Sequence, residues 1–296
     1  MPLPSQPQNK GCCRRAFLIA LVTAAVIFLP FIIWDKGYFF FYGDFNVQQV
    51  PFYQMAHDAI RRGDIFWNWN TDLGANFIGS YSFYLLGSPF FWLTLPFPTS
   101  FVPHLMGPLL ILKHACAAFT GTLYLKRFVK ERDYAVFGGL LYAFSGFAVY
   151  NVFFNHFHEA IVFFPLLLVG LEELIVHNRR GVFALAVAIN AFVNYWFFIG
   201  EVVFVVLYFI VRALSPDWRM NLRRFFWTAF ESVLGLLLSM ALFLPAVLAI
   251  MGNPRTGADE LLSGWNLWLY WHQQLYPAIV SSAFFPPDLP SRPNLF

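Results

Sequence analysis

One candidate for acid–base chemistry is Asp44, in the stretch of residues 42–46, with Gln48 and Gln49 close behind. A carboxylate flanked by a glycine and side-chain amides can accept a proton from an attacking hydroxyl or hold a metal ion. The alternative is structural, because Asp44 lies a few residues before a predicted amphipathic helix and aspartate often caps helix starts. Asp44 is therefore either a catalytic base or a helix cap.

A second polar cluster, Asn155, His156, His158 and Glu159, falls where the third predicted membrane helix ends and the fourth begins. Histidines beside a glutamate can bind a divalent cation or act as acid and base. The i, i+2 spacing of the histidines argues against a tight zinc site, and polar groups at a helix junction are the structural alternative. An acid at the head of a membrane helix is costly unless it faces protein or water, which favours a functional Glu159.

Glu201 lies between the fifth and sixth predicted membrane helices, which are expected to form a tight hairpin around Gly200. The topology predicted from the positions of lysine and arginine places Glu201 on the same side of the membrane as Asp44 and the cluster at residues 155–159. Asp44, Glu159 and Glu201 are therefore expected to converge on one cavity with His156 and His158.

Other polar residues have simpler interpretations. Asn190 and Asn194, in the fifth predicted helix, are expected to make interhelical hydrogen bonds. Glu172 and Glu173 are expected at a membrane surface near residues 179–180, where solvated ion pairs are more common than catalysis.

The composition excludes an ordinary soluble domain. Hydrophobic residues make up 59% of the chain and charged residues 12%, against roughly half and a quarter in soluble proteins. The net charge of +3 is small, and no basic patch with interleaved aromatics indicates nucleic acid. No nucleotide-binding or hydrolase motif is present. An enzyme of this kind would therefore receive its activated substrate on a membrane lipid.

Stretches of spanning length predict seven membrane helices and an all-α integral membrane fold. Most lysines and arginines fall in segments on the side of the amino terminus, which places that terminus in the cytoplasm of a multi-pass protein in the bacterial plasma membrane. The predicted parts are a cytoplasmic tail (1–15), a first membrane helix (16–34), an outer loop (35–100), six further membrane helices (101–251) and an outer segment (252–296). The last segment carries Pro286, Pro287, Pro290 and Pro293 near its end and no further hydrophobic run, so we expect the chain to be the front part of a longer protein.

The outer loop has two recognisable parts. Val50, Tyr53, His57 and Ile60 recur at helical spacing, so 47–62 is predicted to be an amphipathic helix along the membrane interface. A dense group of aromatic residues follows and is expected to form a belt at headgroup depth. It comprises Trp67, Trp69, Phe77, Tyr81, Phe83, Tyr84, Phe90, Phe91 and Trp92.

Spaced motifs over roughly the first 175 residues resemble the YfhO family of bacterial membrane proteins. The matching stretches are Gly43-Asp44 with Gln48 and Pro51-Phe52, Trp69 with Leu73-Gly74-Ala75-Asn76-Phe77, Tyr84-Leu85-Leu86, Ser88-Pro89-Phe90, Ser145-Gly146-Phe147, and Pro165-Leu166-Leu167 with Gly170-Leu171-Glu172. Such proteins are similar to the GT-C class of glycosyltransferases. The resemblance implies a GT-C-like bundle, a catalytic acid in the first outer loop and a polyprenyl-phosphate sugar donor.

By that resemblance Asp44 is the candidate base, and Glu159 stands where the family usually has an aspartate. The hypothesis is transfer of a hexosyl or N-acetylhexosaminyl group to an envelope glycan or teichoic acid on the outer face. The catalytic residues would be Asp44 and Glu159, and the residues predicted to bind substrate are Gln48, Arg61, Asn76, His156, His158 and Glu201. Arg61 or Arg62 would neutralise the lipid phosphate. No metal ligand is assigned, and a divalent cation is the one cofactor considered.

Two other classes of function stay open. A transporter or lipid flippase would use Glu159 and Glu201 as proton or ion sites, and it predicts paired helix breaks in two related halves. A non-catalytic envelope scaffold would tolerate replacement of Asp44 by asparagine. Membrane lipid is a partner in all three hypotheses, and nucleic acid is a partner in none.

Overall fold

A computed structural model of the chain describes residues 11–39, 43–71, 73–218 and 220–251. The predicted outer segment 252–296 and most of the predicted tail lie outside these residues. The chain divides into two units, Met1–Val247 and Leu248–Phe296. The fold and the site described below belong to the first unit.

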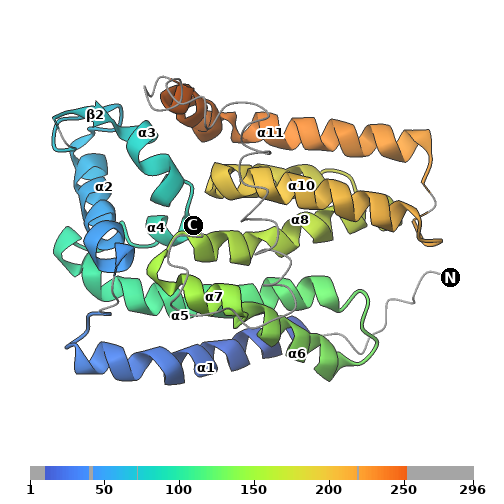
Figure 1. Cartoon of the computed structure of the whole chain (residues 1–296), viewed down its shortest axis with the longest axis horizontal. Helices are drawn as coiled ribbons and strands as arrows, with labels where there is room; N and C mark the ends of the chain where they lie inside the picture. The colour runs from blue at the N-terminus through green and yellow to red at the C-terminus, as the bar shows by residue number, and fades with distance from the viewer. Residues whose placement is uncertain (1–10, 40–42, 72, 219, 252–296) are drawn as a thin grey trace, which may run out of the picture. The chain divides into compact units, whose positions relative to one another are not determined.

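The described part is an all-α membrane protein, as predicted, with one two-stranded hairpin in the loop (Figure 1). Six of its helical segments are long and apolar enough to cross a membrane. They are Cys12–Trp34 (α1), Thr99–Leu125 (η4 and α5), Arg132–Phe153 (α6, α7 and η5), Phe157–His177 (α8), Tyr195–Ala213 (α10) and Leu222–Met251 (α11). A further helix, α9 (Val182–Val193), is apolar but only 12 residues long.

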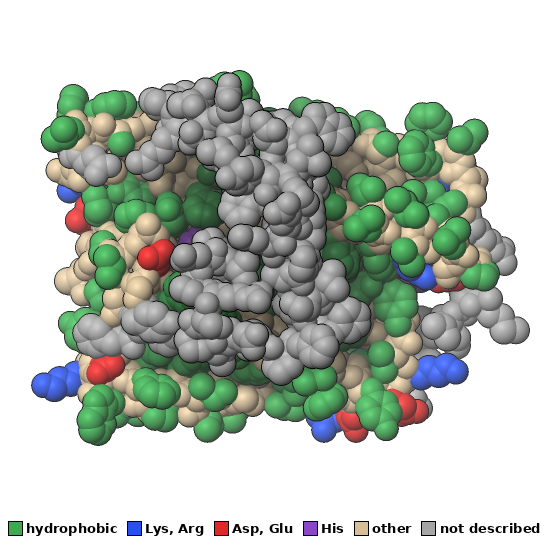
Figure 2. Space-filling model, in the orientation of Figure 1, with side chains coloured by type: hydrophobic (Ala, Val, Ile, Leu, Met, Phe, Trp, Pro, Cys, Tyr) green, Lys and Arg blue, Asp and Glu red, His purple; other side chains and the backbone are tan. Residues whose placement is uncertain are grey.

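Large apolar side chains cover the outward faces of these helices (Figure 2). Val26 of α1, Val211 of α10 and Leu238 of α11 are each more than 60% exposed. Water would make such a surface prone to association, whereas lipid tails solvate it. Charged side chains gather at the two ends of the helices in the same view.

Small residues bring the inner helices close together. Ala16, Ala20 and Ala24 repeat every fourth residue on α1 and are fully buried. A Cβ atom at Gly139 of α6 would lie 2.8 Å from a carbonyl oxygen of α5, and one at Gly170 of α8 would lie 2.9 Å from the backbone of α9. Because lipid gives no hydrophobic drive between helices, such close backbone contact is a main source of their association.

Two predicted helices end differently in the structure. The third is interrupted at Phe144, where Ser145 caps a new short helix, α7 (Gly146–Tyr150). The boundary between the fifth and sixth falls at Asn194 rather than near Gly200, because the Asn194 side chain accepts the N–H groups of Trp196 and Phe197 and starts α10. Glu201 therefore lies inside a membrane helix and not in a loop.

The predicted outer loop folds back onto the bundle. In order it contains η2 (Phe45–Gln49), α2 (Val50–Arg62), β1 (Trp67–Asn68), β2 (Ala75–Asn76), α3 (Phe77–Tyr81), η3 (Ser82–Leu86), α4 (Pro89–Trp92) and η4 (Thr99–Phe101). Tyr53 and His57 of α2 are fully buried against protein. The predicted amphipathic helix corresponds to α2, and its apolar face packs on the bundle rather than on lipid.

The predicted aromatic belt is also divided. Trp67, Trp69 and Trp92 are 47% exposed or more, as a belt requires, whereas Tyr81 and Phe91 are almost fully buried. The buried rings fill the core between α2 and α5, because the loop packs inward. We call the end of the helices that carries this loop the loop end.

The opposite end, called the basic end, is closed by ion pairs. Glu173 pairs with Arg179, as predicted, and with Arg127. Glu172 instead binds Arg212 at 2.8 Å and accepts hydrogen bonds from Trp218. These contacts fasten α8 to the ends of α5 and α10.

Gly87, just after η3, offers a test of this packing. A Cβ atom there would overlap the carbonyl oxygen of Phe192 in α9. We expect Gly87→Ala to destabilise the protein by about 1–3 kcal/mol through overpacking. Gly200→Ala is the matched control, because its Cβ would meet nothing within 4 Å and alanine favours helix by up to about 1 kcal/mol. Thermal unfolding in detergent measures both, and equal effects would contradict the close approach.

Candidate active site

The candidate site lies at the loop end, where three segments meet. Residues 44–49 reach it from the first part of the loop, η3 reaches it from the second, and η5 (Asn151–Phe153) leads into the start of α8. Both η2 and η3 are π-helical. Such helices are rare and are often found at functional sites, because they widen the turn and redirect side chains.

Asp44, Gln48, Gln49, Tyr84 and His156 form an outer cluster. Gln49 donates a hydrogen bond to Gln48 Oε1 at 3.1 Å, and its own Oε1 lies 3.1 Å from His156 Nδ1. Burial raises the pKa of Tyr84, the charge of Asp44 raises it further, and a hydrogen bond with Gln48 opposes both. The cluster therefore joins the predicted base to the predicted histidine.

Asp44 does not cap the helix that it precedes. It occupies the position before η2 but makes no capping hydrogen bond. Its side chain is half-buried, so the carboxylate is accessible. The capping interpretation is therefore not supported.

His156 is a neutral imidazole, and one of its two ring nitrogens has no hydrogen-bond partner among the described residues. The ring centroids of Phe83 and Phe157 lie 4.7 Å away and that of Tyr84 lies 5.1 Å away. Burial lowers the pKa of His156 to about 3, and the charge of Lys113 acts in the same direction. Because Nδ1 faces an amide oxygen, it carries the proton. Nε2 is thus an acceptor, and within the described residues it has no hydrogen-bond partner.

A buried polar layer lies beneath this cluster, on the side of the membrane interior. Lys113, in the middle of α5, lies 2.9 Å from Glu159 Oε1 and donates to both the backbone and side-chain oxygens of Asn155, each at 2.9 Å. Ser88 donates to Glu159 at 2.5 Å, and Asn155 donates to Tyr53 at 3.2 Å. Lys113 and Glu159 are at most 2% exposed.

This buried layer holds Asn155, the residue that precedes His156, in place. The ammonium of Lys113 has three N–H groups, and the three oxygens around it match them. Glu159 is therefore occupied by an ion pair, which suits a positioning role better than proton transfer. The structure thus separates Asp44 and Glu159, the two predicted catalytic acids, into different layers.

The other predicted site residues lie elsewhere. His158 turns away from His156 and binds the carbonyl oxygen of Ala148 at 2.8 Å. Arg61 donates to the carbonyl oxygens of Leu95 and Phe97, and Asn76 caps α3. These three side chains make structural contacts.

Glu201 is 9% exposed within α10, and its Oε2 has no hydrogen-bond partner among the described residues. Across the described ranges, no three His, Cys, Asp or Glu side chains gather as metal ligands would. The predicted convergence thus places Asp44 and His156 each beside Tyr84 in one cluster, with Glu159 one layer below.

Several site residues were not singled out from the sequence. The sequence does indicate Lys113, because a lysine in the middle of a membrane helix needs a charged or polar partner and is usually part of a functional site. Tyr84 and Ser88 lie in the stretches that resemble the YfhO family, but nothing in their spacing indicated a polar role. Tyr53 was assigned to an apolar face.

Comparisons with known proteins agree on one family. The family model described as "Bacterial membrane protein YfhO" matches residues 16–286. A protein of Bacillus subtilis (strain 168) named "Uncharacterized protein YfhO" is 24% identical over 245 residues, which cover 76% of this chain. The chain spans 28% of the length of that relative. No solved structure matches the chain.

Breaking the buried ion pair from one side should be costly. Lys113→Met leaves the Glu159 carboxylate uncompensated, and we expect a loss of about 3–5 kcal/mol in unfolding free energy. The double variant Lys113→Met/Glu159→Leu should recover most of that loss. Lys130→Met, an exposed lysine at the basic end, is the control. Unfolding in detergent followed by circular dichroism measures all four proteins, and an equal loss in the single and double variants would contradict the pairing.

The neutral state of His156 predicts a dependence of stability on pH. Its folded pKa lies below the unfolded value of about 6.5, so between these values the unfolded state binds more protons. Stability should therefore fall as the pH falls below about 6.5, by about 2 kcal/mol at pH ~5. His156→Gln has no such titration, so the wild-type protein should lose more stability than this variant between pH ~7 and ~5. Parallel pH profiles would place the His156 pKa near its ordinary value.

Proposed function

This chain belongs to the YfhO family of bacterial membrane proteins, and we propose that it acts as a membrane glycosyltransferase. The donor would be a sugar on a polyprenyl phosphate, and the acceptor a hydroxyl of an envelope glycan or teichoic acid. The observation that supports this best is the outer cluster, which contains the half-buried Asp44 and a neutral His156 whose buried Nε2 has no hydrogen-bond partner among the described residues. The donor and acceptor classes come from the resemblance to GT-C enzymes.

In the proposed reaction the acceptor oxygen attacks the anomeric carbon of the donor sugar. The bond between that carbon and the phosphate oxygen breaks, and polyprenyl phosphate leaves with the bonding electrons. Asp44 takes the proton of the attacking hydroxyl, as a general base does. His156 Nε2 accepts a hydrogen bond from a sugar hydroxyl and so orients the ring. Each sugar transferred leaves one protonated Asp44, which loses its proton to solvent.

Glu159 and Lys113 have a positioning role in this scheme. Their pair holds Asn155, and through the backbone of that residue it holds His156. Arg62 is the candidate cation for the lipid phosphate, because its pair with Asp64 is half-exposed and easily exchanged. Arg61 is less suitable, since its N–H groups already bind two carbonyl oxygens.

The same proposal places the amino terminus in the cytoplasm and the loop end outside. The distribution of charge supports it, because positive residues concentrate on the cytoplasmic side of membrane proteins. The described lysines and arginines at the basic end are Arg14, Arg15, Lys126, Arg127, Lys130, Arg132, Arg179, Arg180, Arg212, Arg223 and Arg224, and those at the loop end are Lys36, Arg61 and Arg62. Polymer on the outer face would then reach Asp44 directly.

Transport is the second candidate function. Glu201 is the observation that favours it, because an unpaired carboxyl inside a membrane helix is a common ion or proton site. The helix breaks at Phe144 and Asn194 are also features of transporters. If Glu201→Gln abolished lipid or ion movement in vesicles while Asp44→Asn had no effect on any activity, this second function would replace the first.

Asp44→Asn is the decisive substitution for glycosyl transfer. It keeps the size of the side chain but removes the base, so we expect transfer of labelled sugar from polyprenyl phosphate into envelope polymer to fall about 10²–10⁴-fold. Asp35→Asn makes the same change at the end of α1, in a residue with no role in the cluster, and should leave transfer unchanged. The assay uses cells with matched expression of each protein. Unchanged transfer in Asp44→Asn removes this residue from the mechanism.

A further inference from the structure

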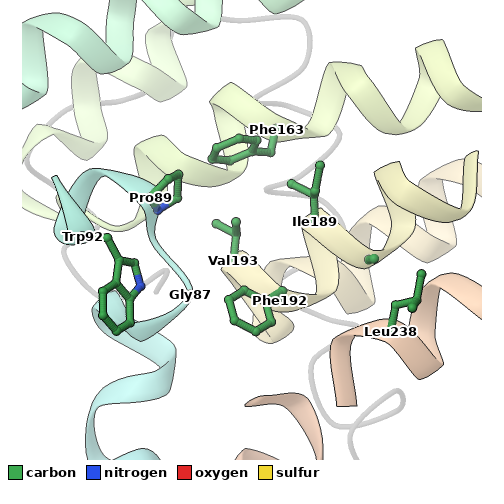
Figure 3. Close-up of a pocket in the computed structure, with 9 residues that line it drawn as sticks. Gly87, Pro89, Trp92, Phe163, Ile189, Phe192, Val193 and Leu238 are labelled. Atoms are coloured by element: carbon green, nitrogen blue, oxygen red, sulfur yellow. The ribbon is translucent and has the colours of Figure 1, made fainter. Parts of the chain in front are cut away.

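Two hollows on the helical bundle differ in what lines them. One, of about 470 Å³, is bordered by residues 87–92 and by α8, α9 and α11 (Figure 3). Its lining side chains carry no charge, so they favour no particular head group. The other, of about 330 Å³, is lined by a cation as well as by aromatic rings. Its residues are Arg223, Phe226, Trp227 and Phe230 of α11, and we call it the arginine hollow.

The four side chains of the arginine hollow lie on one face of α11. Positions 223, 226, 227 and 230 are spaced i, i+3, i+4 and i+7, which is one stripe of an α-helix. Arg223 is the second residue of this membrane-spanning helix, and Phe230 lies about 10 Å further along its axis. The arginine is therefore at the membrane surface, and the aromatic rings are at increasing depth.

A second arginine lies beside the hollow. Arg180, in the connection between α8 and α9, places its guanidinium carbon 4.0 Å from the centroid of the Trp227 ring. A guanidinium at this distance is attracted by the face of the ring. The start of α11 adds the partial positive charge of a helix amino terminus close to Arg223. The surface end of the hollow is therefore positive.

The described acidic side chains do not neutralise this charge. Arg127, Arg179 and Arg212 at the same end each pair with a glutamate. No ion pair within the described ranges includes Arg180 or Arg223, and both side chains are exposed. These two arginines therefore differ from their neighbours at the basic end.

Glu231, the acid that follows Phe230 in the sequence, is already bound elsewhere. It is 1% exposed, and its two carboxylate oxygens accept hydrogen bonds from the backbone N–H groups of Gly181 and Ala184, at 2.8 and 3.1 Å. These N–H groups belong to the start of α9, so the charge of Glu231 is compensated there. The arginine hollow thus calls for an anion that the described residues do not supply.

Position and chemistry together select a lipid with an anionic head group. Arg223 lies at the surface, at the level of lipid phosphates, and Phe226 and Phe230 are 66% and 54% exposed to the apolar layer below it. A free phosphate would leave these rings uncovered. A zwitterionic head group would bring a cation that finds no acid among the residues that line the hollow. Clustered arginines beside a membrane helix attract anionic lipids over neutral ones.

We propose that the arginine hollow binds an anionic phospholipid, with its phosphate between Arg180 and Arg223 and an acyl chain along Phe226 and Phe230. The lipid would tie α11 to the connection between α8 and α9, because its phosphate contacts one arginine from each. The hollow lies at the basic end, whereas the outer cluster lies at the loop end. The proposal therefore does not depend on the proposed sugar transfer.

Photo-crosslinking of the full chain in phosphatidylcholine vesicles tests this site. One probe is phosphatidylglycerol with a diazirine in an acyl chain, and the other is phosphatidylcholine with the same chain, present as the same small fraction of the lipid. We expect the first probe to label residues 223–230 about tenfold more than the second. Arg180→Gln/Arg223→Gln should reduce labelling by phosphatidylglycerol to the level of phosphatidylcholine, whose own labelling should not change.

Arg14→Gln/Lys130→Gln is the matched control, because it removes two exposed positive charges from the same end without touching the hollow. It should leave labelling by phosphatidylglycerol unchanged. An equal loss in the control and in the hollow variant would show only the general attraction of a basic surface and would overturn the proposal. Equal labelling by the two probes, or labelling of residues 223–230 by neither, would overturn it as well.

A competition with inorganic phosphate separates a lipid site from a simple anion site. Because the acyl chain holds the lipid on the aromatic rings, an excess of inorganic phosphate should leave labelling by phosphatidylglycerol in place. Complete displacement of the probe would show that the two arginines bind a free anion, and the lipid would be the wrong ligand.

Discussion

A charge within an apolar bundle must be paired, and the pair of Lys113 with Glu159 is the constraint on which the rest of the site depends. Neither ion can leave without stranding the other in a medium that does not solvate it. The pair also fixes its hydrogen-bond partners. Lys113 donates to two oxygens of Asn155, and the Ser88 hydroxyl donates a hydrogen bond to Glu159. The pair thus joins α5, the start of α8 and the returning loop, which are far apart in the sequence.

That junction accounts for the outer cluster above it. Once Asn155 is fixed, His156 is held among aromatic rings with Nδ1 turned to Gln49, and η2 is aligned so that Asp44 stands beside Tyr84. Burial keeps the His156 imidazole neutral, so its Nε2 is a hydrogen-bond acceptor at neutral pH. A rigid, ion-paired layer therefore supports the outer cluster, as preorganised sites require.

Much of this architecture followed from the sequence, because the bilayer imposes a length and a composition on each span. The choice of Asp44 and His156 as candidates also followed from residue type and, for Asp44, from the family resemblance. The roles of Glu159 and Arg61 were not, since a partner such as Lys113 or a pair of carbonyl oxygens is a tertiary contact with no local signature. The boundary at Asn194 was missed for another reason: a capping side chain outweighed the flexibility expected of Gly200.

The central claim is that Asp44 and His156 act in the same sugar-transfer step. A double-mutant cycle on the rate of sugar transfer, with Asp44→Asn, His156→Gln and the combined variant, tests it most directly. Residues that act as a unit are not additive. The account predicts that the double variant transfers sugar at nearly the rate of Asp44→Asn alone, a coupling of about 1.4 kcal/mol or more. Losses that simply add would place the two residues in separate roles and contradict the account.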